Sequence, residues 1–147
     1  MGQGFRMAAS IPAALRETIL ANAELVAWLA PYLGSPGIFT ADLAPPDARM
    51  PFCVIGPAVT DAGETLLDGS EGPRDVVRDV KLYCEAKGET DEIDRMAEIL
   101  RGVLHSRVLA VDGFRSARTR IVNGPIGVSA DTDSYGRLVS VRVHLTR

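Results

Sequence analysis

The stretch GRLVSVRVHLTR (136–147) decides the fold, because apolar and polar side chains alternate along it. Its aliphatic residues are Val139, Val141, Val143 and Leu145, and they alternate with Ser140, Arg142, His144 and Thr146. A period of two predicts a β-strand with one apolar and one polar face. The apolar face requires a core. The polar face could meet water, a substrate or another copy of the protein.

A second stretch, RDVVRDVKLYCEA (74–86), repeats this pattern and is the clearest strand of the chain. Its apolar face carries Val76, Val80, Leu82 and Cys84, and its other face carries Val77, Asp79, Lys81, Tyr83 and Glu85. The second face again carries charge. We therefore expect two strands with the same division into an apolar and a charged side.

Helices are predicted on either side of the first strands. Ser10 as an N-cap and Pro12 in the first turn predict one bent helix or two short ones over 11–30. A second helix should begin at Thr90 or Asp91, whose acidic first turn suits the helix dipole. Its apolar stripe consists of Ile93, Met96, Ala97, Leu100, Val103 and Leu104. A stripe at this spacing predicts that the helix lies on a sheet.

Further strands are expected at 52–60, 107–111 and 114–133. Pro57 lacks a backbone donor and implies a strand edge or a bulge. Turn signals occur at 112–113, 123–124 and 135–136. The predicted fold is α+β, with an antiparallel or mixed β-sheet and two helices packed on one face. The opposite face is left uncovered, because one chain lacks the apolar material to cover both sides.

Length and composition predict a single domain over residues 1–147. The chain is 46% hydrophobic, which is enough for one core and too little for two ordinary domains. We expect residues 1–10 to form a flexible N-terminal extension. The acidic, glycine-rich segment 61–73 is expected to be a mobile arm between strands. Within it, Leu66 and Leu67 either fold back on the core or dock elsewhere, and Asp68 follows them.

The charge balance argues against tight, non-specific binding of nucleic acid. Sixteen basic and 19 acidic residues leave a net charge of -3, whereas such binding needs a basic surface. A local basic patch remains at Arg115, Arg118 and Arg120. Because only Phe114 could stack on a base there, we favour an acidic protein neighbour over DNA as its partner.

The residues that carry chemistry form no recognisable catalytic, metal or cofactor motif. Cys53 and Cys84 fall in expected strands and are predicted to be buried, reduced thiols. A hydrolase would need His105 or His144 beside a thiol or carboxylate. The stretch DTDSYG (131–136) has only half of a calcium-loop pattern, and no glycine pattern fits a phosphate loop. A small ligand-binding module would need a pocket with converging polar groups.

The longest apolar segment, 17–34, is interrupted by charged and polar residues and by Pro31, so no membrane span is predicted. The N-terminal residues lack the apolar core of a signal peptide. We expect the protein to be made in a cytoplasm.

Several phrases in sequence order resemble the tail-completion, or tail-terminator, family of long-tailed bacteriophages and gene transfer agents. They are LRETILANAELVAWLA, APPDARMPFCVIGP, a gap with Leu-Asp-Gly, RDVVRDVKLYCEAKGETDEIDRMAEILRGVL and a closing alternating strand. The resemblance runs from about residue 12 onward. The residues that match the family's pattern are Pro46, Pro51, Phe52, Val54, Arg78, Val80, Tyr83, Asp91, Ala97 and Leu104. The stretches 1–10 and 114–133 depart from it.

The resemblance implies a non-enzymatic virion protein that forms a ring of six copies at the head-proximal end of a tail tube. Its implied partners are other copies of itself, the tail tube protein and the head connector or stopper protein, while DNA passes through the lumen without specific binding. A head-to-tail connector or neck protein is the alternative within the same particle. Candidate subunit or partner contacts are Leu66, Leu67, Asp68, Asp79, Lys81, Arg115, Arg118, Arg120, Arg142 and His144.

Overall fold

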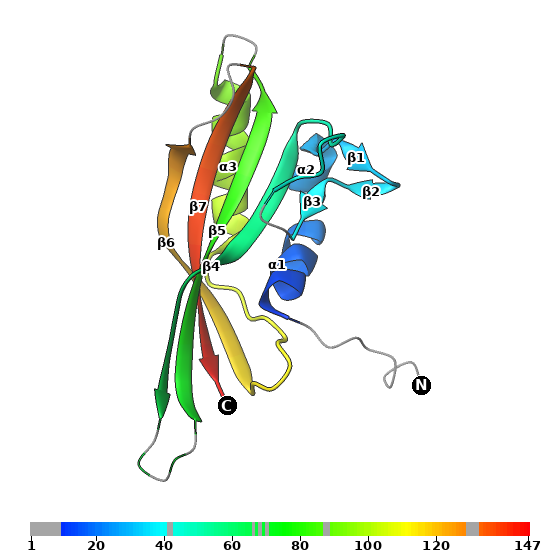
Figure 1. Cartoon of the computed structure of the whole chain (residues 1–147). Coiled ribbons are helices and arrows are strands. Elements are labelled where there is room, and N and C mark those ends of the chain that lie inside the picture. Colours follow the sequence, from blue (N-terminus) through cyan, green and yellow to red (C-terminus); the bar gives the residue numbers. More distant parts are fainter. Residues whose placement is uncertain are drawn as a thin grey trace.

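The computed structural model describes residues 10–40, 43–65, 67, 69, 71–86, 89–128 and 133–147, with side chains except at 64, 65 and 71. Figure 1 shows the arrangement of the elements. In chain order these are α1 (Ile11–Leu20), α2 (Ala23–Trp28), β1 (Pro31–Tyr32), β2 (Ser35–Pro36), β3 (Ile38–Phe39), β4 (Phe52–Thr65), β5 (Glu71–Glu85), α3 (Asp91–Leu104), β6 (Ser116–Val128) and β7 (Ser134–Thr146).

The main sheet has five strands in the order β3-β4-β5-β7-β6. β3 runs parallel to β4, and every other neighbouring pair is antiparallel. The short strands β1 and β2 form a separate two-stranded sheet. The mixed sheet and the single α+β domain agree with the sequence prediction.

The N-terminal helical region consists of two short helices because each has its own cap. The Ser10 hydroxyl accepts a hydrogen bond from the Ala13 amide (3.2 Å), and the Asn22 side chain accepts one from the Leu25 amide (2.8 Å). These bonds satisfy amides that have no partner within the helix.

The core lies between the sheet and the helices. The stripe predicted for α3 is buried in full, and the alternate residues predicted for β5 and β7 are buried opposite it. Figure 1 shows α3 behind β5 and β7, with α1 and α2 toward the β3–β4 side. Beyond α3, the connection to β6 continues this cover by burying Leu109 and Val111 in the same core. The helices thus collect on one face, as predicted.

Residues 107–111 do not form the strand that their composition suggests. Only Val108 makes an isolated β-bridge, with Arg118 of β6. The Leu109 amide donates to the Ala117 carbonyl (2.8 Å), and the Thr119 amide donates to the Arg107 carbonyl (2.8 Å). The segment covers the outer edge of β6 and then turns inward, because Leu109 and Val111 belong to the core.

Two of the three predicted turns are wrong. Residues 112–113 do form a turn, but 123–124 lie inside β6 and 135–136 lie inside β7. Gly124 occupies a bulge at φ +91°, where a Cβ atom would approach the Leu138 carbonyl oxygen to 2.3 Å. At Gly136, a Cβ would clash with Val128 and the ring of Tyr83. Both glycines therefore serve close packing within the sheet.

The segment 61–73 is largely strand, which corrects the expectation of an arm between strands. β4 continues to Thr65 and β5 begins at Glu71, so the two form one long hairpin. Pro57 lies at a register shift between Ile55 and Ala58, which confirms the predicted bulge. Leu66, Asp68 and residues 1–9 lie outside the described residues.

Candidate assembly surface

The side of the main sheet opposite the helices carries the residues predicted as a charged face. The strand register places the following residues there: Asp75, Val77, Asp79, Lys81 and Tyr83 of β5; Leu138, Ser140, Arg142 and His144 of β7; and Arg118, Arg120, Asn123 and Ile126 of β6. We call this the uncovered face. The described helices all pack on the opposite side of the sheet.

Two cross-strand polar pairs join β5 to β7 on the uncovered face. The Ser140 hydroxyl donates to Asp79 Oδ1 (2.6 Å), and His144 Nδ1 lies 2.9 Å from Asp75 Oδ1. Each carboxylate makes its contact through one oxygen atom, Oδ1, within the described part of the chain. The Ser140 contact also explains why this serine is buried although its position was predicted to be on the polar side.

The three arginines of the uncovered face form a cluster. Arg120 lies directly opposite Arg142, and Arg118 lies opposite His144. All three arginines are exposed, and none makes a hydrogen bond or ion pair with another described residue. Like charges directly opposite each other on a sheet are destabilising. The arginine cluster (Arg118, Arg120, Arg142) is therefore a feature of the folded chain that an anionic partner would stabilise.

The charge on the uncovered face changes sign across the sheet. β6 and β7 contribute the arginine cluster, whereas β5, nearer to the β4 edge, contributes the carboxylates of Asp75 and Asp79. Lys81 is partly buried among them. The face thus has a basic side toward β6 and a predominantly acidic side toward β4.

The remaining predicted contact residues lie apart from this face. Arg115 precedes β6, where its amide donates to the Thr146 carbonyl (2.8 Å) and its side chain is exposed. Leu67, at the tip of the β4–β5 hairpin, is fully exposed. The leucine has therefore not folded back on the core, which was one of the two expectations for it. Its neighbours Leu66 and Asp68 are not among the described residues.

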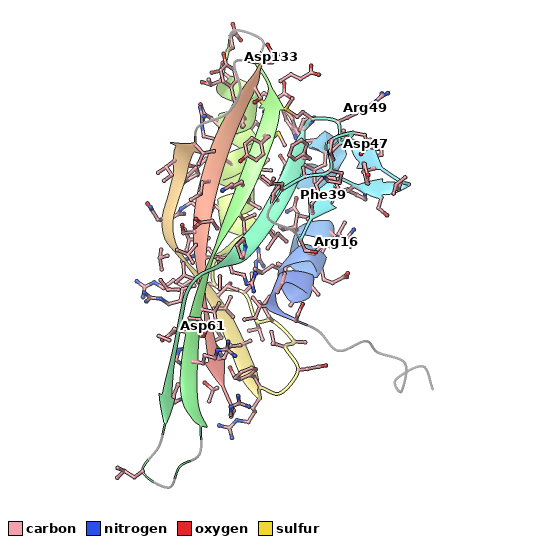
Figure 2. All side chains as sticks on the ribbon, viewed as in Figure 1. Arg16, Phe39, Asp47, Arg49, Asp61 and Asp133 are labelled. Atoms are coloured by element: carbon pink, nitrogen blue, oxygen red, sulfur yellow. The ribbon has the colours of Figure 1, made fainter. Side chains whose placement is uncertain are left out.

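A row of aromatic rings crosses the top of the sheet and was missed by sequence reasoning. Tyr32 contacts Phe39 edge to face (centroids 5.2 Å apart), Phe39 contacts Phe52 (5.8 Å), and Phe52 contacts Tyr83 (5.5 Å). Figure 2 shows Phe39 and Asp47 beside the β1–β2 sheet. The Tyr32 hydroxyl donates to Asp47 Oδ1 (3.0 Å), and this bond raises the pKa of Tyr32. The row ties the β1–β2 sheet to the main sheet.

A second missed cluster lies where the β4–β5 hairpin extends beyond the helices. Asp61, labelled in Figure 2, forms a two-bonded ion pair with Arg74. The Arg74 guanidinium holds the pKa of Asp61 below its usual range. Nearby, Arg78 Nη1 donates to the Gly56 carbonyl (2.8 Å), and partial burial lowers the pKa of Arg78. By register these residues share the side of the sheet that the helices cover.

Among the described residues, the histidines, thiols and hydroxyls do not assemble a nucleophilic site. His144 has a carboxylate neighbour, as a hydrolase would require, but the nearby Ser140 hydroxyl donates to Asp79 instead. Cys53 and Cys84 are both buried, as predicted, on the side facing the helices. Burial raises the pKa of Cys53 to about 12, so its thiol is protonated and inert. His105 Nδ1 accepts the Ile121 amide (3.2 Å), a structural role.

Pockets and ion sites give little support for a ligand-binding module. One pocket of about 110 Å³ is lined by Ser106, Arg107, Val108, Arg118 and Thr119, whereas sites for small ligands occupy roughly 300–1,000 Å³. A larger hollow of about 720 Å³ beside Pro31 and Arg49 falls within this size range, but it is open to solvent. Within the described ranges, no three His, Cys, Asp or Glu side chains cluster as metal ligands, and Asp131 falls outside these ranges.

Of the helices in the described part of the chain, none combines the length and apolar character needed to span a bilayer.

Comparison with protein-family models and with curated proteins finds no match. Solved structures do match. A chain from the virion of a native gene transfer agent particle superposes with a TM-score of 0.73 at 16% identity, covering 94% of this chain and 96% of that chain. A second solved structure gives a TM-score of 0.59 at 16% identity, covering 93% and 94%. The chain therefore shares its fold, over nearly its whole length, with a gene transfer agent virion protein.

Proposed function

We propose that this chain is a structural virion protein of a bacteriophage or gene transfer agent, and that it is the tail terminator of the particle. The observation that carries the proposal is the uncovered face, with its arginine cluster lacking acidic partners within the described chain. The sequence resemblance and the fold shared with a gene transfer agent virion protein support the same assignment.

The proposed role is a ring, of six copies by resemblance, at the head-proximal end of the tail tube. A sheet covered by helices on one face only suits this role. The helices stabilise each subunit, and the uncovered face is available to other chains. The ring would stop tube growth and offer a surface to the head connector or stopper. It would assemble in the bacterial cytoplasm and persist in the virion.

DNA would pass through the lumen of this ring without specific binding. The net charge of -3 favours weak, transient contact with DNA, because a sliding polyanion is slowed by a strongly basic channel. We therefore assign the arginine cluster to contacts with protein and not to the DNA path. Leu67, exposed at the hairpin tip, is the proposed contact with the tail tube.

Electron microscopy of particles that lack this chain tests the proposal. A tail terminator predicts overlong tails, whether or not these tails join heads. Normal-length tails separated from finished heads would instead indicate the connector or neck role. Joined tails of normal length would contradict both roles.

The control is complementation with the wild-type chain, beside a variant of the uncovered face such as Arg120→Glu. Wild-type protein should restore tails of normal length. The variant should fold but restore fewer joined particles, because its defect lies in assembly. Equal restoration by the variant would count against the uncovered face as the assembly surface.

A further inference from the structure

One edge of the main sheet is open along most of β4. β3 pairs with β4 only at Cys53 and Val54, so no described strand pairs with the outer edge of β4 from Gly56 onward. The residues of this edge that lie on the uncovered face are small: Thr60 and Ala62 are both exposed. Val59 is 58% exposed on the same edge. This edge of β4 therefore carries small, partly apolar side chains and is accessible to another chain.

The opposite edge of the sheet has complementary properties. Outside β6, Val108 bridges to Arg118 and exposes 72% of its side chain. The connecting segment already satisfies the edge of β6, since the Ser106 amide donates to the Thr119 carbonyl (3.1 Å). Simple addition of another strand is therefore blocked at this level. What this edge offers is an apolar side chain flanked by unpaired arginines.

The strand register places both edges at the same height. Ala62 lies opposite Asp75, Asp75 opposite His144, His144 opposite Arg118, and Arg118 beside Val108. A second copy placed beside the first would therefore bring the basic β6 side against the acidic β4–β5 side without a shift along the strands. Contacts of this head-to-tail kind close into rings when the rotation between copies allows.

We propose that copies of this chain pack side by side and head to tail, with the basic β6 side of one copy (Arg118 and Arg120) set against the acidic β4–β5 side of the next (Asp75 and Asp79). This inference rests on the proposed function and specifies its subunit contact. The opposite charges attract each other through space across the joint, because the intervening strands, about 4.8 Å apart, hold the arginines and the carboxylates beyond hydrogen-bond reach. Val108 and Val59 supply apolar contact at the same joint.

A charge exchange tests this contact. The basic-side variant is Arg118→Glu with Arg120→Glu, and the acidic-side variant is Asp75→Lys with Asp79→Lys. Alone, each variant faces like charges at every joint and should associate roughly tenfold more weakly than wild type at low salt. Mixed in equal amounts, they should form alternating rings, since every joint again pairs opposite charges. Undiminished association of either variant alone, or a mixture that stays dissociated while both variants are folded, would overturn the proposal.

Disulfide trapping provides a test that does not depend on the stability of the charge variants. Ala62→Cys and Val108→Cys are introduced together and the protein is oxidised. Within one copy these positions are four strand spacings apart, about 19 Å, too far for a disulfide. We expect a ladder of linked species beyond the dimer, because each copy contributes one cysteine to each of two joints. The matched control is Ala62→Cys with Ile126→Cys, which places the second cysteine at the far end of β6.

The outcomes separate this contact from the proposed function. Rings of wild-type protein without a disulfide ladder would reject this particular contact between the β6 side and the β4 edge, and would leave the terminator role intact. If the protein gives a disulfide ladder but particles lacking this chain still carry joined tails of normal length, the terminator role is rejected and the contact stands. Equal ladders from the test pair and the Ile126→Cys control would show unspecific collision and would reject the contact.

Discussion

The two faces of the main sheet come from the same strands and the same alternation, yet their chemistry is opposite. Toward the helices, β7 places four aliphatic side chains that are fully buried. On the other side the same strand places Arg142 and His144, which are exposed. The comparison separates two tasks: one face stabilises the subunit, and the other contributes little to its stability and is available for assembly. Substitutions on the two faces should therefore affect different measurements.

The largest effect on stability is expected on the helix-covered face. Leu100 of α3 is completely buried in the core. Leu100→Ala should lower the free energy of unfolding by about 2–5 kcal/mol, because it removes buried apolar surface and leaves a cavity. Urea denaturation followed by circular dichroism measures this. Ile126→Ala, at a partly exposed site on the uncovered face, is the control and should change stability by about 0.5 kcal/mol or less.

A smaller loss is expected at the bulge of β6. Gly124→Ala should cost about 2 kcal/mol, because the new Cβ would meet the Leu138 carbonyl and the backbone has a positive φ. Gly127→Ala is the matched control on the same strand, where the nearest atom to a Cβ is Arg137 Nη1 at 3.9 Å. Thermal melting of both variants gives the comparison. Equal melting temperatures would show that position 124 tolerates a side chain and would contradict this role of Gly124.

The ion pair between Asp94 of α3 and Arg137 of β7 should make a pH-dependent contribution to the free energy of unfolding. Arg137 Nε donates to Asp94 Oδ1 (2.6 Å), and this bond lowers the pKa of Asp94 from its ordinary value of 3.8. Because the pKa of Asp94 is lower in the folded state, the ion pair stabilises the protein at pH values above the ordinary pKa. This stabilisation is lost as the pH falls through the folded-state pKa. Asp94→Asn should cost about 0.5 kcal/mol at neutral pH, as expected for a pair whose carboxylate is about half exposed to solvent.

Denaturation curves of wild type and Asp94→Asn across acidic pH test the sign of this effect. The difference in unfolding free energy should shrink as the pH falls below 3.8. A difference that grows on acidification would contradict the role given to Arg137.

The smallest effect on stability is expected on the uncovered face. Arg120→Ala removes one of two opposed arginines, so the folding free energy should change by about 0.5 kcal/mol or less, toward greater stability. Its association should nevertheless weaken. Combined denaturation and light scattering separate the two effects. A variant that is destabilised as strongly as Leu100→Ala would show that the arginine belongs to the fold and not to assembly.

Local patterns in the sequence were sufficient to predict which residues of β5, β7 and α3 lie on the buried face. Alternation and helical spacing are set by backbone geometry, and the buried residues of these elements are those predicted. The charged residues Asp79, Arg142 and His144 were assigned to the correct side for the same reason. Composition misled at 61–73, where glycine and acidic residues suggested a loop although pairing with β5 maintains a strand.

The features that the sequence did not predict depend on distant partners. The aromatic row draws its rings from β1, β3, β4 and β5. The pair of Asp61 and Arg74 requires the register of the β4–β5 hairpin. Gly124 was interpreted as a turn because Asn-Gly usually forms one, whereas in the fold it lies where the Leu138 backbone leaves no room for a side chain.

Sedimentation velocity of the wild-type protein at low and at high salt tests most directly whether the charged face mediates assembly. We predict a discrete closed oligomer at low salt that shifts toward monomer at high salt, because salt screens exposed opposite charges. Monomer in both conditions across a wide range of protein concentration, or an oligomer indifferent to salt, would contradict it.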